Sequence, residues 1–253
     1  MKTLSIKNRK GEKIAVIVEE NENPKGLVFV MHGLGGFKEQ PHVKTFAKAF
    51  LDSKFTVIRF DTTNTFGESD GSYANATFTN YYEDLEDMIA WAETQTWYQE
   101  PFWLSGHSLG GMCTSLYSQK YPKKVRALAP IATTISGELL LKTPEYANTE
   151  EMKERGWIKE RRGIKLKWSH IEDRAKYNIL PEADKLTMPV LMIVGELDDG
   201  SPLKHQQLLF DKLPGKKELH IIKGAPHTFK DRKHLQEIKE IFLKWIDRVT
   251  HNS

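Results

Sequence analysis

Two patterns of hydrophobic residues alternate along most of the chain. Short apolar runs at residues 27–31 and 56–60 predict strands, and the unbroken apolarity of the first indicates a strand covered on both faces. Stripes with helical spacing at residues 43–51 and 81–92 predict amphipathic helices. A β-rich run ends at residue 20, so residues 2–20 are predicted to form an antiparallel hairpin. Such alternation predicts an α/β fold with a mainly parallel sheet and helices on both faces.

The alternation breaks over residues 136–182. Within this segment, residues 157–168 alternate around a polar turn, which is typical of a small hairpin. Apolar runs at residues 190–194 and 218–223 then resume the strand pattern, and a final amphipathic helix follows. We interpret residues 136–182 as a lid inserted into a single domain formed by residues 1–253.

Size and composition exclude several classes of protein. The 253 residues are 39% hydrophobic, enough for a substantial core, and the net charge of +3 is too small to indicate a nucleic-acid partner. No run approaches the ~20 apolar residues of a membrane span, and the N-terminus lacks a secretory signal, so the cytoplasm is the predicted location, without stable membrane insertion. The single cysteine, Cys113, excludes an internal disulfide and a thiolate metal cluster. We expect no metal and no cofactor, and the sequence leaves the oligomeric state open.

Residues 106–110 read Gly-His-Ser-Leu-Gly and lie between an apolar run and a helical stripe. Strand, sharp turn and helix in this order present Ser108 on a strained backbone as a nucleophile. The N–H of Leu109, at the start of the helix, can then stabilise a developing oxyanion. A second Gly-x-Ser-x-Gly occurs at residues 67–71, but no helical stripe follows it, and we interpret Ser69 as a loop serine.

A serine nucleophile needs a base, and the base needs an acid that orients it and stabilises its charge. His227 follows the last predicted strand in a flexible loop, and Asp198 follows the strand before it. Ser108, Asp198 and His227 thus occur in the order expected after such a turn. Asp199 and Glu196 stay open as alternatives for the acid.

The chain resembles the α/β-hydrolase superfamily, and within it bacterial esterases similar to monoglyceride lipases, cinnamoyl esterases and serine-aminopeptidase-type hydrolases. The resemblance spans residues 13–249 and rests on His-Gly-Leu-Gly at residues 32–35, the Ser108 turn, Gly-x-x-Asp ending at Asp198, and the late His227. It implies a mostly parallel eight-stranded sheet flanked by helices, with a lid after the sixth strand. It also implies that the Leu34 N–H is the second oxyanion donor.

Together these features predict a cofactor-independent serine hydrolase that cleaves carboxylic esters through an acyl-enzyme. Short, medium or aromatic acyl chains are expected, because the lid offers Trp157, Leu166 and Trp168 for an acyl pocket. A peptidase or amidase is an alternative that would need carboxylates to capture an amine. The lid segment and its neighbourhood offer four such carboxylates: Glu138, Glu145, Glu172 and Asp173.

Charge in the lid leaves further alternatives open. Residues 153–168 contain seven basic and two acidic side chains. A solvated face is the simpler explanation, and a site for anionic substrates is the other. An acyl thioesterase, whose basic lid meets phosphates of a carrier, and a hydrolase-fold binding protein without turnover also stay open.

Overall fold

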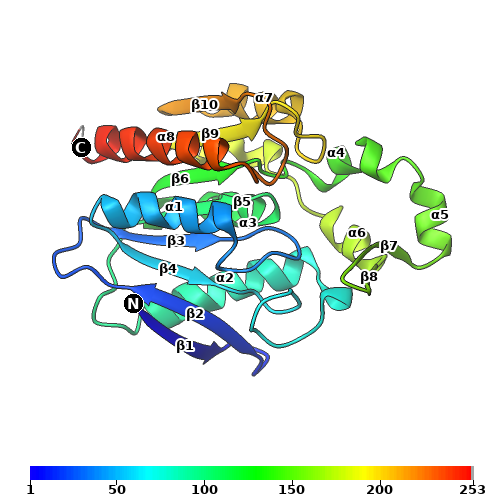
Figure 1. Cartoon of the computed structure of the whole chain (residues 1–253), viewed down its shortest axis with the longest axis horizontal. Helices are drawn as coiled ribbons and strands as arrows, with labels where there is room; N and C mark the ends of the chain where they lie inside the picture. Colours follow the sequence, from blue (N-terminus) through cyan, green and yellow to red (C-terminus); the bar gives the residue numbers. More distant parts are fainter. Residues whose placement is uncertain (252–253) are drawn as a thin grey trace.

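An eight-stranded sheet forms the centre of the structure, a computed structural model that describes residues 1–251 apart from the side chain of Glu145 (Figure 1). The strand order is β1-β2-β4-β3-β5-β6-β9-β10. The first two strands pair antiparallel with each other, β2 also pairs antiparallel with β4, and the remaining pairs are parallel. The predicted hairpin and the predicted mainly parallel sheet are therefore confirmed. The strands are β1 (Lys2–Lys7), β2 (Lys13–Glu19), β3 (Leu27–Met31), β4 (Thr56–Phe60), β5 (Phe102–His107), β6 (Val125–Ile131), β9 (Val190–Gly195) and β10 (Lys217–Ile222).

Helices cover both faces of this sheet. On one face α1 and α8 lie side by side (Figure 1), where the rings of Phe46 and Phe242 stack with centroids 5.2 Å apart. Trp245 of α8 meets Trp103 of the sheet edge to face at 5.1 Å, and both are buried. Burial of each such ring stabilises the fold by about 1.5–3 kcal/mol, which holds this face together. The helices that flank the sheet are α1 (Pro41–Asp52), α2 (Phe78–Ala92), α3 (Leu109–Lys120), α7 (Leu203–Lys212) and α8 (Arg232–His251), and the 3₁₀ turns are Tyr73–Asn75, Pro122–Lys124, Pro144–Tyr146 and Leu180–Lys185.

The segment between β6 and β9 gathers at one end of the sheet, on the right of Figure 1. It contains the predicted hairpin, whose two strands pair antiparallel outside the main sheet. Buried Leu140, Ile158, Leu166 and Ile171 belong to the same apolar core as α2 and α3, so the segment is packed onto the body of the protein. Its elements are α4 (Gly137–Leu141), α5 (Thr149–Glu154), β7 (Trp157–Arg161), β8 (Ile164–Lys167) and α6 (Ser169–Arg174).

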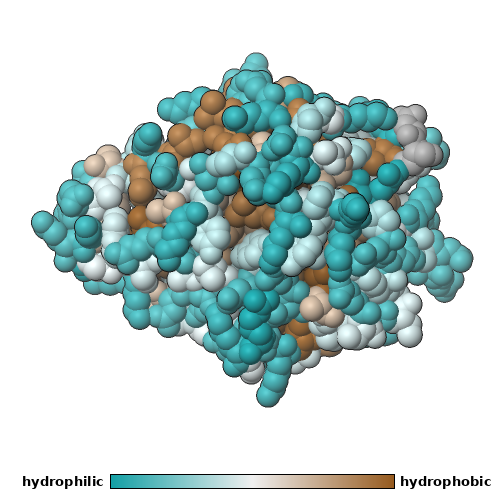
Figure 2. Space-filling model, turned by 180° about the vertical axis from the view of Figure 1, so that it is seen from behind, coloured by the Kyte–Doolittle hydropathy of each residue, from teal (hydrophilic) through white to brown (hydrophobic). Residues whose placement is uncertain are grey.

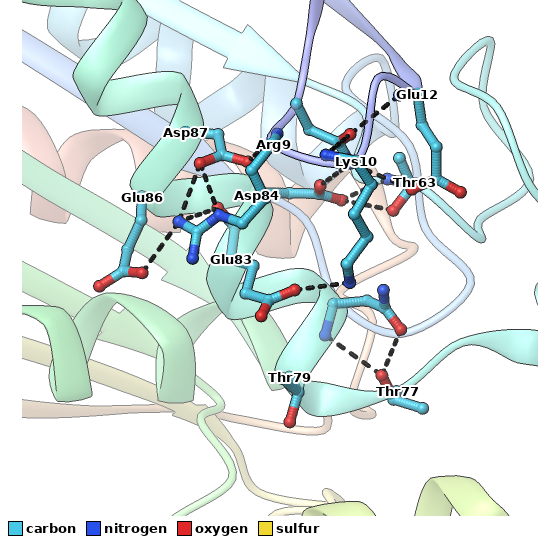
Figure 3. Close-up of polar contacts among 12 residues, drawn as sticks. Arg9, Lys10, Glu12, Thr63, Thr77, Thr79, Glu83, Asp84, Glu86 and Asp87 are labelled. Carbon is cyan, nitrogen blue, oxygen red and sulfur yellow. Dashed lines mark hydrogen bonds and ion pairs between the residues drawn. The ribbon is translucent and has the colours of Figure 1, made fainter.

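The turn of the N-terminal hairpin is held on α2 by charged side chains (Figure 3). Arg9 binds Asp87 at 2.8 Å and Glu86 at 3.1 Å, and Lys10 binds Glu83 at 2.6 Å. These pairs are partly exposed, so each contributes little by itself, about 0–1 kcal/mol. As a network they fix the antiparallel edge of the sheet against the helix.

Asp84 lies buried beneath this network and joins the hairpin turn to the loop after β4. Its carboxylate accepts hydrogen bonds from Asn8 Nδ2 at 3.0 Å, Thr63 N at 2.6 Å and Thr63 Oγ1 at 2.7 Å. Burial nevertheless raises the pKa of the Asp84 carboxyl to about 6, against an ordinary value of 3.8. The cost of burying the charge therefore exceeds the help from the three donors.

A pH-dependent stability follows from this carboxyl. Because the pKa is raised in the folded state, the stabilisation by Asp84 is full below pH 3.8 and is lost as the pH rises through about 6. We expect the free energy of unfolding of wild type, relative to Asp84→Asn, to fall by about 2 kcal/mol between about pH 4 and about pH 7. Urea titrations of both proteins at several pH values measure this difference, and a difference that does not change with pH would contradict the prediction.

Hydrophilic residues dominate the face shown in Figure 2, with separate hydrophobic areas between them. The large hydrophobic side chains that are exposed beyond the first residue are few: Leu197, Leu208 and Ile221. Within residues 1–251, none of the helices has the length and apolarity needed to cross a bilayer.

Candidate active site

Ser108 lies at the turn between β5 and α3, in a backbone conformation that is strained for a residue with a side chain. Its φ is 54° and its ψ is −115°. A Cβ on Gly106 would lie 2.3 Å from the Gly110 carbonyl oxygen, and one on Gly110 would lie 2.4 Å from the His32 carbonyl oxygen. Only glycine allows strand, helix and the neighbouring loop to approach so closely. The turn therefore presents the Ser108 hydroxyl at the carboxyl end of the sheet, where it lines a cavity.

A chain of hydrogen bonds connects Ser108, His227 and Asp198. The Ser108 Oγ lies 2.9 Å from His227 Nε2, and His227 Nδ1 lies 2.8 Å from Asp198 Oδ2. With the proton on Nδ1 donated to the carboxylate, Nε2 is free to accept the hydroxyl proton. The structure thus brings two residues to His227, Asp198 and Ser108, which lie 29 and 119 positions from it along the chain.

The three acidic candidates occupy different places in the loop after β9. The side chain of Asp198 is fully buried, and its Oδ1 accepts a hydrogen bond from Ser201 N at 2.7 Å while Oδ2 faces His227. Glu196 instead accepts from Gly224 N at 2.8 Å, and Asp199 is exposed at the rim of the cavity. Of these acids, Asp198 has the geometry of a partner for His227.

The loop after β3 faces the Ser108 turn and is held in a fixed shape. The Gly33 carbonyl accepts from Gly36 N at 2.9 Å and lies 2.8 Å from His32 Nδ1, and Gly35 N donates to Tyr81 Oη at 3.1 Å. Leu34, within this loop, lines the same cavity as Ser108. Leu109 is the first residue of α3, so its N–H has no acceptor within the helix. Leu109 therefore directly follows the nucleophile, and Leu34 lies in the wall of the cavity that contains it.

Two further histidines surround His227, and the sequence did not indicate a role for either. His107 Nε2 donates to the His227 carbonyl oxygen at 2.8 Å, and the rings of His107 and His42 lie 4.4 Å apart. Burial lowers the pKa of His42 to about 3 and the pKa of His107 well below its ordinary value. Both are therefore neutral near pH 7, so they add no positive charge beside His227 when it takes up a proton. In the sequence, the position of His107 directly before Ser108 was the one feature that could have indicated a histidine beside His227.

A cavity of about 480 Å³ opens above the Ser108 hydroxyl. The residues that line it include Leu140, Tyr146 and Thr134, together with the basic residues Lys159, Arg161 and Arg174. From the sequence, the basic residues at positions 153–168 were interpreted as a group that includes Lys159 and Arg161, and Arg174 was not indicated. The predicted lid residues are not among those that line the cavity: Trp157, Leu166 and Trp168.

Packing explains where the structure places these three side chains. Leu166 is fully buried in the core. Trp157 is covered by cations, with Arg155 at 4.0 Å and Lys165 at 4.7 Å from its ring centroid. The indole N–H of Trp168 donates to Glu172 Oε1 at 3.1 Å. None of them is therefore brought together with Ser108.

Ser69, in the second Gly-x-Ser-x-Gly, makes hydrogen bonds with the backbone. Its hydroxyl donates to the Asp61 carbonyl at 2.7 Å and accepts from Ala15 N at 2.8 Å, which ties the loop to β2. Asp61 itself is buried and binds Lys38 Nζ at 2.7 Å. These contacts agree with the interpretation of Ser69 as a loop serine. Among the described residues, no group of three His, Cys, Asp or Glu side chains is arranged to hold a metal ion.

Comparisons with known proteins identify a family for this chain and structures with a similar fold. The family model described as serine aminopeptidase, S33, matches residues 22–168. Est1E from Butyrivibrio proteoclasticus, solved with ferulic acid bound, superposes with a TM-score of 0.85 at 19% identity, over 97% of this chain and 98% of that one. Alpha/beta hydrolase domain-containing protein 10 from mouse superposes with a TM-score of 0.81 at 18% identity, over 98% and 100% of the chains. An uncharacterized 31.7 kDa protein from the traX-finO intergenic region of Escherichia coli is 24% identical, over 90% of this chain and 92% of its own length.

Proposed function

Since the chain belongs to the hydrolase family described as serine aminopeptidase, S33, and has the α/β-hydrolase fold, we propose that it cleaves carboxylic esters with Ser108 as nucleophile. The hydrogen-bonded chain from Ser108 through His227 to Asp198 is the observation that carries this proposal. Residues 136–182 form a lid over this site within one hydrolase domain, and the cytoplasm is the proposed location.

The acylation step follows from the geometry. Ser108 Oγ attacks the ester carbonyl carbon while its proton passes to His227 Nε2, and Asp198 stabilises the resulting imidazolium. The negative charge that develops on the carbonyl oxygen is held by the N–H groups of Leu34 and Leu109. Collapse of the tetrahedral intermediate breaks the bond to the alcohol, which leaves with the proton from His227, and an acyl-Ser108 ester remains.

Deacylation uses the same groups in reverse. A water molecule attacks the acyl carbon and gives a proton to His227, and the second tetrahedral intermediate is held by the same N–H groups. Its collapse releases the carboxylic acid and returns the proton to Ser108 Oγ. Both steps use only side chains and backbone N–H groups of the protein, the substrate and water.

The contents of the cavity favour an ester over a peptide with a free amino terminus. A peptidase site that captures an ammonium group requires carboxylates. Among the described residues that line the cavity, the carboxylate is that of Asp199 at the rim, whereas Lys159, Arg161 and Arg174 are cations. Asp173 accepts hydrogen bonds from Thr79 N and Oγ1. Glu172 is bound by the Trp168 indole and Glu138 lies in α4, while the side chain of Glu145 is outside the described residues. Glu172 and Asp173 are thus engaged elsewhere, and Glu138 is not among the described residues that line the cavity.

Hydrolysis of a series of 4-nitrophenyl esters, from acetate to palmitate, together with an aminoacyl 4-nitroanilide, tests this function. We expect turnover of the short and medium esters, because a cavity of about 480 Å³ accommodates a small acyl chain, and no turnover of the anilide. Release of 4-nitrophenol measured by absorbance reports both. Turnover of the anilide alone would replace the esterase proposal with a peptidase. Labelling by a fluorophosphonate without turnover of the esters or the anilide would contradict both and favour a thioesterase.

A further inference from the structure

Two neighbouring peptide groups determine the direction of the Leu34 N–H, the oxyanion donor in the loop after β3. The N–H belongs to the peptide between Gly33 and Leu34, and the Leu34 carbonyl belongs to the peptide between Leu34 and Gly35. Glycine at residues 33, 35 and 36 gives this loop more backbone freedom than residues with side chains would allow. The orientation of the donor therefore depends on contacts that hold both peptides from outside.

Groups close by in the chain hold the first peptide. The Gly33 carbonyl accepts from Gly36 N at 2.9 Å and lies 2.8 Å from His32 Nδ1. Since Thr62 N donates to His32 Nε2 at 3.1 Å, the proton of the neutral ring lies on Nδ1, which donates to the Gly33 carbonyl. Burial lowers the pKa of His32, so the ring stays neutral near pH 7. A carbonyl with two donors polarises its own peptide group, which makes the Leu34 N–H a stronger donor.

Side chains from two distant elements hold the second peptide at its two ends. Gly35 N donates to Tyr81 Oη of α2 at 3.1 Å, across 46 positions of the chain. Arg161 Nη1 of β7 donates to the Leu34 carbonyl at 3.2 Å, across 127 positions. The helix α2 packs on the main sheet, whereas β7 belongs to the segment between β6 and β9. One peptide of the loop is thus fixed from both parts of the protein.

Tyr81 is itself held firmly. Its side chain is fully buried, and its ring meets the His32 ring edge to face, with centroids 5.7 Å apart. Burial raises the pKa of the Tyr81 hydroxyl above its ordinary value, although hydrogen bonds with Thr65 and Thr62 oppose the shift. The hydroxyl is therefore protonated and neutral near pH 7, and its oxygen accepts from Gly35 N. A side chain fixed at both ring and hydroxyl is a rigid support for the loop.

We propose that Tyr81 and Arg161 are positioning residues for ester hydrolysis, which hold the peptide between Leu34 and Gly35 so that the Leu34 N–H points at the developing oxyanion. The inference rests on the proposed ester hydrolysis and adds two residues outside the triad and the oxyanion donors. Both act through the backbone of the loop and need no contact with the substrate. The hairpin that contains β7 thereby contributes to the reaction through the Leu34 carbonyl.

Tyr81→Phe tests the support from α2. The variant keeps the ring and removes the hydroxyl, so Gly35 N loses its acceptor and the peptide can rotate. Loss of a whole oxyanion donor typically lowers kcat about 100- to 1000-fold, and we expect a misaligned donor to lower kcat for 4-nitrophenyl butyrate about 10- to 100-fold. The value of kcat/KM should fall by the same factor, as expected of a contact made only in the transition state. Tyr82→Phe is the control, because the Tyr82 ring stacks on Phe78, and its kcat should stay at the wild-type value.

Arg161→Gln tests the support from the hairpin. Arg161 is exposed, so its replacement leaves the core intact, and 4-nitrophenyl butyrate is neutral, so loss of the charge does not by itself change substrate binding. We expect kcat/KM to fall about 3- to 10-fold, less than in Tyr81→Phe, because an exposed hydrogen bond is weaker than a buried one. Arg162→Gln removes a charge from the next residue, which lies 4.9 Å from the Phe66 ring centroid, and should keep the wild-type kcat/KM.

A pair of neutral inhibitors distinguishes donor alignment from general damage to the cavity. The carbonyl carbon of 1,1,1-trifluorohexan-2-one forms a bond with Ser108 Oγ, the carbonyl π electrons move to its oxygen, and the hydroxyl proton passes to His227, so the adduct carries an oxyanion. Hexan-2-ol has the same chain length and no carbonyl. In both variants the Ki of the ketone should rise by about the factor by which kcat/KM falls, whereas the Ki of the alcohol should change less than about 2-fold.

The outcomes separate this inference from the proposed function. Wild-type kcat in Tyr81→Phe, with a wild-type circular dichroism spectrum, would overturn the role of Tyr81, and wild-type kcat/KM in Arg161→Gln would overturn that of the hairpin. An equal rise of both inhibition constants would overturn the positioning role in favour of a disturbed cavity. If Tyr81→Phe does not fold, Arg161→Gln alone decides. Absence of ester turnover by the wild type would overturn the proposed ester hydrolysis and this inference with it.

Discussion

Replacing Ser108 with alanine should lower kcat for ester hydrolysis by about 10⁵- to 10⁶-fold, the range typical of nucleophile loss in a serine triad. Without Oγ no acyl-enzyme forms, and only the binding and oxyanion groups continue to assist direct attack by water. The fold should survive, because the strained turn depends on Gly106 and Gly110 rather than on the hydroxyl. Steady-state kinetics with 4-nitrophenyl butyrate and circular dichroism of the same preparation measure both effects.

The second Gly-x-Ser-x-Gly supplies a matched control. Ser69→Ala removes a hydroxyl with two backbone partners, Ala15 N and the Asp61 carbonyl, and should lower the free energy of unfolding by about 1–3 kcal/mol. Its kcat should stay within a factor of a few of wild type, since Ser69 lies away from the cavity that contains Ser108. If Ser69→Ala were as inactive as Ser108→Ala while still folded, the assignment of the nucleophile would be wrong.

Asp198→Asn should lower kcat by about 10⁴-fold with little change in the structure. The carboxylate now accepts the proton of His227 Nδ1 at 2.8 Å, whereas an asparagine amide in its place can donate to Nδ1 and stabilise the opposite tautomer. His227 Nε2 would then carry a proton and could not accept one from Ser108. The loss should be visible in kcat and should diminish at high pH, where hydroxide competes with the base.

Neighbouring acids serve as controls for Asp198. Glu196→Gln should retain nearly all activity, since Glu196 accepts from Gly224 N on the outer side of the loop. Asp199→Asn, at the cavity rim, should change kcat/KM by less than about 10-fold, as expected for a partly screened surface charge. A collapse of activity in either variant, with Asp198→Asn active, would move the acid to that residue.

Secondary structure followed closely from the hydrophobic pattern. The strands at residues 27–31 and 56–60 were predicted at their observed bounds, because short runs rich in β-branched and aromatic residues favour strands. The hairpin at residues 157–168 was also predicted. Those signals are local, and each is a property of a few consecutive residues.

The cavity wall was harder to predict, and the lid residues show why. In the hairpin, Trp157 and Lys159 are two residues apart on β7, yet only Lys159 lines the cavity. The side chains of Arg155 and Lys165 lie over the Trp157 ring, and Leu166 is buried in the core. Hydrophobicity predicts that a side chain is buried, but it does not predict which neighbours bury it.

By itself the sequence determined the order of strands and helices, the turn that presents Ser108, and a short set of partners at the ends of later strands. These follow from backbone chemistry, since glycines at two positions permit the turn and apolar periodicity sets each element. Only the tertiary structure decided the alignment of Asp198 with His227 and the convergence of Lys159, Arg161 and Arg174 on one cavity. Both depend on how separate segments of the chain pack together, and packing is set by the shapes of all the side chains between them rather than by any local pattern.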